Sequence, residues 1–141
     1  MGKGNLIIIR GLPGAGKTTF GRFLSESIPG ARQIEADQFF EITGPYRFDP
    51  KRIHDAHEWC RSETYFSMSK EVPVIIVSNT FTRNWEMAPY ITLAQRFDYT
   101  YTVLTVESGM QSVNALAQRN IHGVPVETIT AMEGRWEKFG L

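Results

Sequence analysis

The sequence is poor in cysteine and has no excess charge of either sign. Cys60 is the only cysteine among 141 residues, so no disulfide can form within the chain, and a reducing, cytoplasmic setting is expected. There are 15 basic residues (lysine plus arginine) and 15 acidic residues (aspartate plus glutamate). The broad positive surface of a non-specific nucleic-acid-binding protein is therefore missing, and any nucleic acid must be held locally.

The sequence also lacks long apolar runs, repeats and linker-like tracts. No run approaches the length of a membrane span, and the first residues have no small-residue cleavage site like that of a signal peptide. We therefore expect no membrane association. A chain of 141 residues can bury about two thirds of its unfolded surface in one domain, and we expect residues 1–141 to form a single domain.

A glycine-rich segment, Gly11–Thr18, matches the phosphate-binding pattern G-x-x-x-x-G-K-[ST] without a gap. The apolar stretch Leu6–Ile9 precedes it, and a helical pattern with Phe23 on its apolar face follows until Pro29. This order directs backbone N–H groups and a helix N-terminus at phosphate, which predicts binding of a nucleoside triphosphate. The predicted nucleotide-binding residues are Gly11, Leu12, Pro13, Gly14, Ala15, Gly16, Lys17, Thr18 and Thr19.

Strand and helix patterns alternate along the chain. The second strand pattern is polar, which suits a sheet edge, whereas the third is apolar throughout and suits the centre. The alternation predicts an α/β protein with a parallel sheet, helices on both faces, and ligand at the carboxyl ends of the strands. Expected strands lie at 6–9, 32–36, 72–77 and 99–106, and expected helices at 20–28, 50–70, 87–97, 113–117 and 129–139, with Trp136 and Phe139 in the core.

The strand ends narrow the class of nucleotide-using protein. Motor ATPases and GTPases keep an acid at the end of a second apolar strand, whereas here that strand ends at Ser78 and Asn79. There is also no guanine-reading Asn-Lys-x-Asp motif, so a switch GTPase or a translocating ATPase is disfavoured. Asp37 closes the strand at 32–36 instead. It is either a general base that accepts the proton of an attacking hydroxyl and orients Mg²⁺-bound water, or an aspartate that caps a turn.

Arg119 begins a segment, residues 119–125, that glycine and proline mark as a loop between the last two helices. A planar guanidinium there matches the oxygens of a transferred phosphoryl group. The alternative is a solvated arginine at a helix end.

Aromatic and cationic residues alternate between residues 37 and 52, a pattern typical of single-stranded nucleic-acid binding. Tyr46 and Arg47 are the predicted substrate contacts in this stretch. Arg83 and Trp85, just beyond the third strand, are predicted to form the opposite wall of the acceptor site.

Together these segments resemble the polynucleotide-kinase branch of the small P-loop kinases. That branch includes the phage polynucleotide 5′-kinase domain, kinase-like domains of some ubiquitin-ligase-binding proteins, and phage kinases acting on 5-hydroxymethyluracil in DNA. The similar segments keep the same order over nearly the whole chain: Arg10–Thr18, Ala36–Phe40, Tyr46–Pro50, Ala56-His57, Asn79-Thr80, Trp85–Tyr90, Leu116–Asn120 and His122–Pro125.

The resemblance implies a P-loop kinase domain over residues 1–141, with four strands in the order 2-3-1-4 and a lid near the C-terminus. It implies that Lys17 contacts the β- and γ-phosphates of ATP and that Thr18 ligates Mg²⁺. Asp37 would be the general base and Arg119 the lid arginine. Ser78 stands where several members of the branch have aspartate, so the contacts of that aspartate have no counterpart at this position.

The implied function is transfer of the γ-phosphate of ATP to a hydroxyl carried by DNA. The acceptor is either the hydroxymethyl group of 5-hydroxymethyluracil in phage DNA or a 5′-hydroxyl end, so DNA or an oligonucleotide is the expected partner. Two alternatives stay open: a kinase for a small metabolite, favoured by the zero net charge, and a nucleotide-binding adaptor with little catalysis.

Overall fold

The computed structural model describes residues 2–107 and 112–140, and a four-stranded parallel sheet lies at its centre. The strand order is β2-β3-β1-β4, and β1 pairs in parallel with both β3 and β4. This confirms the predicted fold class and strand order, with the polar strand at an edge and the apolar one inside. The strands are β1 (Gly4–Arg10), β2 (Ala31–Ile34), β3 (Val74–Asn79) and β4 (Tyr99–Thr105).

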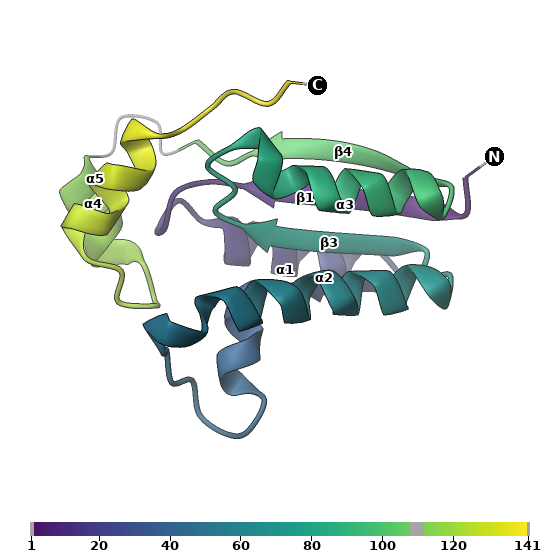
Figure 1. Ribbon diagram of the computed structural model, residues 1–141, viewed down its shortest axis with the longest axis horizontal. Coiled ribbons are helices and arrows are strands. Elements are labelled where there is room, and N and C mark those ends of the chain that lie inside the picture. Colours follow the sequence, from purple (N-terminus) through teal and green to yellow (C-terminus); the bar gives the residue numbers. More distant parts are fainter. Residues whose placement is uncertain (1, 108–111, 141) are drawn as a thin grey trace.

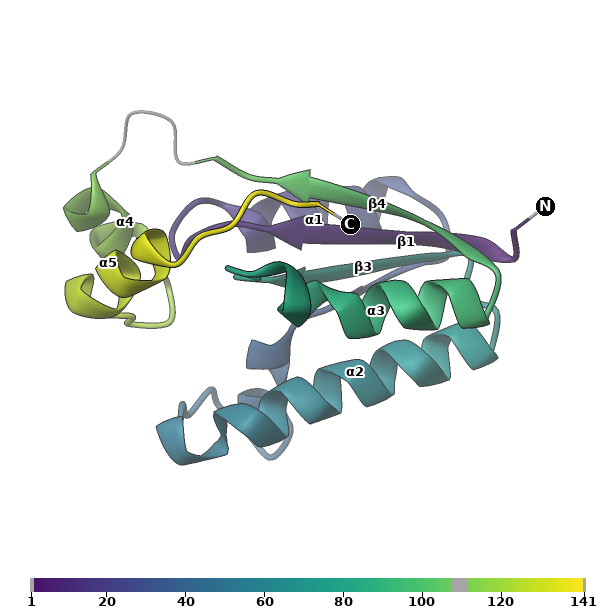
Figure 2. The same ribbon diagram turned by 45° about the horizontal axis from the view of Figure 1, so that its top comes forward.

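Helices cover both faces of the sheet, and two further helices lie beyond the carboxyl ends of the strands (Figures 1 and 2). Helix α1 covers one face, α2 and α3 cover the other, and α4 and α5 pack together at the left of Figure 1. Within the described residues, no helix is both long and apolar enough to cross a membrane. The helices are α1 (Lys17–Ser27), α2 (Ile53–Ser69), α3 (Asn84–Arg96), α4 (Val113–Arg119) and α5 (Val126–Gly134), with short 3-10 helices η1 (Ala36–Glu41) and η2 (Pro50–Arg52).

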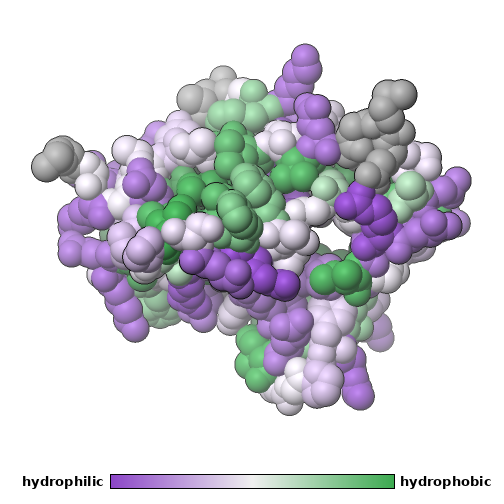
Figure 3. All heavy atoms as spheres, turned by 180° about the vertical axis from the view of Figure 1, so that it is seen from behind, coloured by the Kyte–Doolittle hydropathy of each residue, from purple (hydrophilic) through white to green (hydrophobic). Residues whose placement is uncertain are grey.

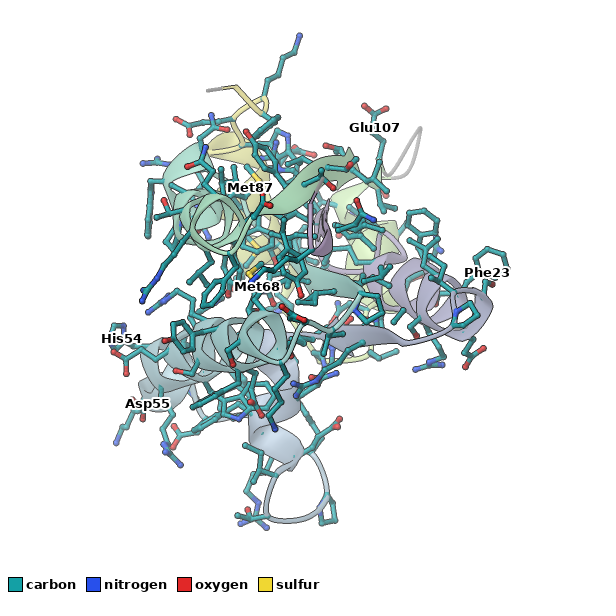
Figure 4. All side chains as sticks on the ribbon, turned by 90° about the vertical axis from the view of Figure 1, so that its right-hand side faces the viewer. Phe23, His54, Asp55, Met68, Met87 and Glu107 are labelled. Carbon is teal, nitrogen blue, oxygen red and sulfur yellow. The ribbon has the colours of Figure 1, made fainter. Side chains whose placement is uncertain are left out.

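The main core lies between the sheet and the pair α2 and α3. Leu6, Ile8 and Val77 from the central strands are fully buried there. Met68 of α2 and Met87 of α3 point into the same layer (Figure 4). Each such side chain stabilises the fold by about 1.5–3 kcal/mol on burial, and the layer fixes the strand ends that carry the site.

Phe23 does not lie on the buried face of α1, which corrects the sequence prediction. Its side chain is 62% exposed and points away from the sheet (Figure 4). Hydrophobic residues gather near the middle of the molecule's face seen from behind (Figure 3). The buried face is centred on Gly21, where an added Cβ would lie 2.9 Å from Ser78 Oγ. Phe23 follows Gly21 by two positions, about 200° around the helix, so it faces solvent.

The predicted last helix ends early, at Gly134 instead of continuing to residue 139. Residues 135–140, here called the C-terminal strap, bond to the segment that follows β3. The Glu137 N–H donates to the Thr82 carbonyl at 2.7 Å, and the Asn84 N–H donates to Glu137 Oε1 at 2.9 Å. These tertiary hydrogen bonds replace the intrahelical ones that a longer helix would make.

Arg10, at the end of β1, anchors the C-terminal strap. Its buried guanidinium donates to the carbonyls of Phe81 and Glu137, each at 2.7 Å. It also stacks on the half-buried Trp136 ring, 4.0 Å from the ring centroid. Phe139, predicted in the core, is exposed. Residues 135–140 therefore connect α5 to the sheet through hydrogen bonds and do not form an amphipathic helix.

Candidate nucleotide and acceptor site

The loop between β1 and α1 is shaped for a bound anion. Gly14 and Gly16 have φ values of 83° and 108°, which residues with side chains rarely adopt. A Cβ on Gly14 would also clash with the Leu116 carbonyl oxygen of α4, so α4 packs directly on this loop. Gly16 is the N-cap of α1 and brings no capping side chain. The N–H groups of the first turn of α1 are thus left for a phosphate.

Lys17 lies across this loop, and its Nζ donates to the Leu12 carbonyl at 3.1 Å. Burial lowers the pKa of the Lys17 ammonium to about 8, although the negative charges of Glu35 and Asp37 partly oppose the shift. An ammonium group beside uncapped backbone donors fits the phosphates of ATP, because triphosphate charge favours the protonated form of lysine.

Glu35 is a buried carboxylate that the sequence analysis did not select. Its Oε2 accepts a hydrogen bond from the Thr18 hydroxyl at 3.4 Å, and its Oε1 accepts one from the Gln33 amide at 3.1 Å. Burial raises the pKa of Glu35. The Glu-x-Asp spacing at residues 35–37, directly after a strand, is the sequence signal that could have identified it. Glu35 therefore lies beside the predicted Mg²⁺ ligand.

Ser78 does not lie in the open part of the site. It is buried under α1 at Gly21, and within the described part of the chain its Oγ has no hydrogen-bond partner. The carboxylate bonded to Thr18 comes instead from Glu35, just after β2. Among the described residues, no three His, Cys, Asp or Glu side chains converge to hold a metal. The Thr18 hydroxyl, together with phosphate oxygens and water, would suit Mg²⁺, which prefers to retain waters.

Asp37 lies in the first turn of η1 and not at the end of a strand, which corrects the sequence prediction. Strand β2 ends at Ile34, and the chain then turns because the Gln38 side chain accepts the Glu35 N–H at 3.2 Å. This turn leaves Asp37 half-buried at the carboxyl edge of the sheet.

Two side chains hold the Asp37 carboxylate, and together the three residues are here called the acceptor cluster. The Tyr46 hydroxyl donates to Oδ1 at 3.2 Å, and His122 Nε2 lies 3.3 Å from Oδ2. The Tyr46 and His122 rings are 5.0 Å apart. Burial and the Asp37 charge raise the pKa of Tyr46, which keeps its hydroxyl a donor. A carboxylate has about four lone-pair sites, so Asp37 can still accept a proton from a hydroxyl.

Of the cluster residues, Asp37 and Tyr46 were selected from sequence. Tyr46 was expected to contact substrate directly, and the structure shows it bonded to Asp37. His122 was part of a segment that resembles the polynucleotide-kinase branch, but no role followed from the sequence. Its contact with Asp37 spans 85 positions (122 minus 37), which no local pattern encodes.

Arg119 is the last residue of α4 and is exposed, so it lies at a helix end, as the second interpretation expected, and not in the loop. The loop begins at Asn120, whose side chain donates to the Ala117 carbonyl and accepts the Val124 N–H, each at 2.8 Å. Arg47 and Arg83 are exposed. Within residues 2–107 and 112–140, no ion pair or side-chain hydrogen bond links these three arginines to the acceptor cluster, so their roles stay predictions.

Comparison with known proteins gives the same fold. The model of the family described as "AAA domain" matches residues 6–138. Human NEDD4-binding protein 2 is 37% identical over 135 residues, which is 95% of this chain but 8% of that protein. A chain of the Pnkp1/Rnl/Hen1 RNA repair complex superposes with a TM-score of 0.69 at 16% identity, covering 94% of this chain and 43% of that one.

A gluconokinase from Sinorhizobium meliloti has a TM-score of 0.56 at 16% identity, covering 98% of this chain and 78% of that one. At these identities the solved structures establish a shared P-loop kinase-like fold.

Proposed function

Because the chain belongs to the AAA domain family, whose fold it shares with kinases, we propose that it is an ATP-dependent kinase. The proposed acceptor is a hydroxyl carried by DNA: either the hydroxymethyl group of 5-hydroxymethyluracil in phage DNA or a 5′-hydroxyl end. The proposal includes a single kinase domain over residues 1–141 and a reducing cytoplasmic location, which the lone buried cysteine favours.

The residues of the loop divide the work of holding ATP and Mg²⁺. When bound, ATP supplies the phosphoryl group and Mg²⁺ neutralises its charge. The backbone of Gly11–Thr19 and the Lys17 ammonium hold the phosphates, with the Thr18 hydroxyl toward Mg²⁺ and Glu35 fixing the Thr18 rotamer through its hydrogen bond. The Arg119 guanidinium stabilises charge on the transferring oxygens.

One observation carries the proposal: the Asp37 carboxylate is oriented by Tyr46 and His122 close enough to the loop that its charge acts on Lys17. In this arrangement Asp37 accepts the proton of the acceptor hydroxyl as phosphoryl transfer proceeds, while Tyr46 and His122 keep the carboxylate in place. General base catalysis of this kind contributes about 10²–10⁴ in rate.

A polynucleotide acceptor is favoured by the aromatic and cationic residues around the cluster. Tyr46, Arg47 and Arg83 are the proposed contacts. The likeness to a chain of an RNA repair complex also supports nucleic acid as the substrate class. A small-molecule kinase is the second candidate, supported by the likeness to a gluconokinase. A nucleotide-binding adaptor is the third, supported by the relative whose name describes binding to NEDD4.

Transfer of labelled phosphate from ATP to a panel of acceptors tests these candidates. The panel contains DNA with 5-hydroxymethyluracil, 5′-hydroxyl oligonucleotides, free nucleosides and gluconate. Labelling of DNA supports the proposal, and labelling confined to a nucleoside or gluconate replaces it with the small-molecule kinase. ATP binding without transfer to any acceptor supports the third candidate, the nucleotide-binding adaptor.

A further inference from the structure

A groove runs along the outer surface between α2 and α3, which lie side by side in Figures 1 and 2. It encloses about 770 Å³. Aromatic rings line it from both helices: Tyr65 and Phe66 from α2, and Trp85 from α3. Phe66 is 54% exposed and Trp85 is 69% exposed. These rings present open faces to whatever enters the groove.

The charge of the groove is of one sign. Arg61 and Arg96 line it, and none of its ten lining residues is Asp or Glu. The Arg96 guanidinium lies 5.4 Å from the Tyr65 ring centroid, so this cation reaches across from α3 to α2. The zero net charge of the chain makes such a local absence of acids informative, because a neutral protein must concentrate its cations to hold a polyanion.

The first turn of α3, which carries Trp85, follows β3 at the carboxyl edge of the sheet, the same edge at which the acceptor cluster lies. Asn79, the last residue of β3, accepts the Ala36 N–H at 2.9 Å beside Asp37, and Trp85 follows six positions later in the first turn of α3. From Trp85 to Arg96 the helix extends about 16 Å, room for a few nucleotides. Helix α3 ends at Arg96, by the amino ends of the strands and away from the site (Figure 1).

We propose that the groove between α2 and α3 binds the single strand that continues beyond the phosphorylated hydroxyl. Bases stack on Trp85 and Phe66, and Arg61 and Arg96 contact phosphates. Interleaved rings and arginines are the chemistry that holds single strands without reading their sequence. This inference rests on the proposed function, since it assigns the path of that same substrate.

Fluorescence anisotropy with a long, 3′-labelled 5′-hydroxyl oligodeoxynucleotide tests the groove. Phe66→Ala and Trp85→Ala should each weaken binding about fivefold to tenfold, the effect of losing one stacked base. The double variant Arg61→Gln/Arg96→Gln should lower the slope of log K against log salt by about 1.4, the value for two phosphate contacts on a single strand. Phe66, Trp85 and Arg96 are exposed and Arg61 is half-buried, and circular dichroism checks that the variants fold.

Matched controls lie on α1, on the opposite face of the sheet. Phe23→Ala removes a ring of similar exposure, 62%, and Arg22→Gln removes an exposed arginine; both should bind the oligonucleotide as the wild type does.

If the wild type phosphorylates oligonucleotides but the groove variants bind them unchanged, the groove assignment is overturned while the kinase proposal stands. If the wild type neither binds nor phosphorylates any oligonucleotide, both fail. The groove is then left to a protein segment.

Discussion

The phosphate loop and the acceptor cluster lie at the same edge of the sheet but are assembled in opposite ways. The loop is one contiguous segment, Gly11–Thr18, and its donors are chiefly backbone N–H groups at the start of α1. Among the described residues, no backbone N–H donates to the Asp37 carboxylate: a tyrosine from the 42–49 connection and a histidine from the α4–α5 connection hold Asp37 in η1. One region is built by local geometry, the other by tertiary packing.

This difference assigns separate consequences to the two regions. Changes in the loop should alter ATP affinity, because they act on phosphate in the ground state. Changes in the acceptor cluster should alter the transfer rate at nearly constant ATP affinity, because they act on the acceptor hydroxyl. Changes at Arg119 should do the same, because they act on transition-state charge. Variants in each region therefore test whether ATP affinity and transfer rate respond separately.

Arg119→Ala is expected to have the largest effect, a fall of about 10³–10⁵ in the single-turnover rate. A guanidinium placed on the transferring phosphoryl acts mainly on transition-state charge, so ATP affinity should change far less. Arg119→Lys keeps the positive charge without the planar guanidinium, so its single-turnover rate should lie between those of the wild type and Arg119→Ala. Rapid-quench measurement of labelled product checks this, with Arg22→Ala on α1 as the control. A fall in the single-turnover rate of less than about fivefold would show that Arg119 does not act on the transferring phosphoryl group.

Asp37→Asn should lower phosphoryl transfer by about 10²–10⁴, because the amide has the shape of the carboxylate without its basic site. ATP should bind at least as tightly, since one negative charge near the phosphates is lost. Steady-state kinetics together with calorimetric ATP titration checks both parts. The matched control is Asp55→Asn, which alters an exposed aspartate of α2 that forms an ion pair with Arg52. Wild-type rates in Asp37→Asn would make this residue structural.

Lys17→Ala should weaken ATP binding at least tenfold with unchanged circular dichroism, because the ammonium lies at the start of α1, where we propose that the phosphates bind. Isothermal titration with ATP measures the affinity. Wild-type affinity in this variant would contradict the loop assignment.

The pH dependence of ATP binding sharpens the same point. The Lys17 pKa of about 8 lies below its ordinary value of 10.5 because of burial. As pH rises through about 8, the free protein loses the ammonium that phosphate requires. ATP affinity should therefore fall above pH 8, by at most about tenfold per pH unit. Lys17→Arg stays charged and should lose this dependence; a persistent slope would assign it to another group.

Tyr46→Phe should have the smallest effect, about a tenfold fall in transfer rate, from loss of one hydrogen bond to a charged acceptor. A double-mutant cycle decides whether Tyr46 acts through Asp37: in an Asp37→Asn background, Tyr46→Phe should have little further effect. Additive losses would show that Tyr46 contacts substrate directly, as the sequence alone suggested.

Much of the fold was predictable from local patterns. The apolar stretches and the polar second strand placed the strands correctly, and the resemblance supplied their order, which the structure confirms. The end of the last helix was not predictable, because Arg10 and Thr82 hold residues 135–140 by bonds to distant parts of the chain. The exposure of Phe23 follows from the close approach of Gly21 to Ser78, which periodicity does not register.

Local sequence is enough to specify the glycine loop, the uncapped start of α1, and the presence of an acid after the second strand, because backbone conformation and strand burial depend on neighbouring residues. Three features come from tertiary packing: Tyr46 and His122 converge on Asp37, Glu35 bonds to Thr18, and Ser78 is buried beneath α1. These contacts join side chains from separate connections, and their positions depend on how η1, α4 and α5 pack against the sheet. That packing is a property of the whole chain, so no short segment of the sequence contains it.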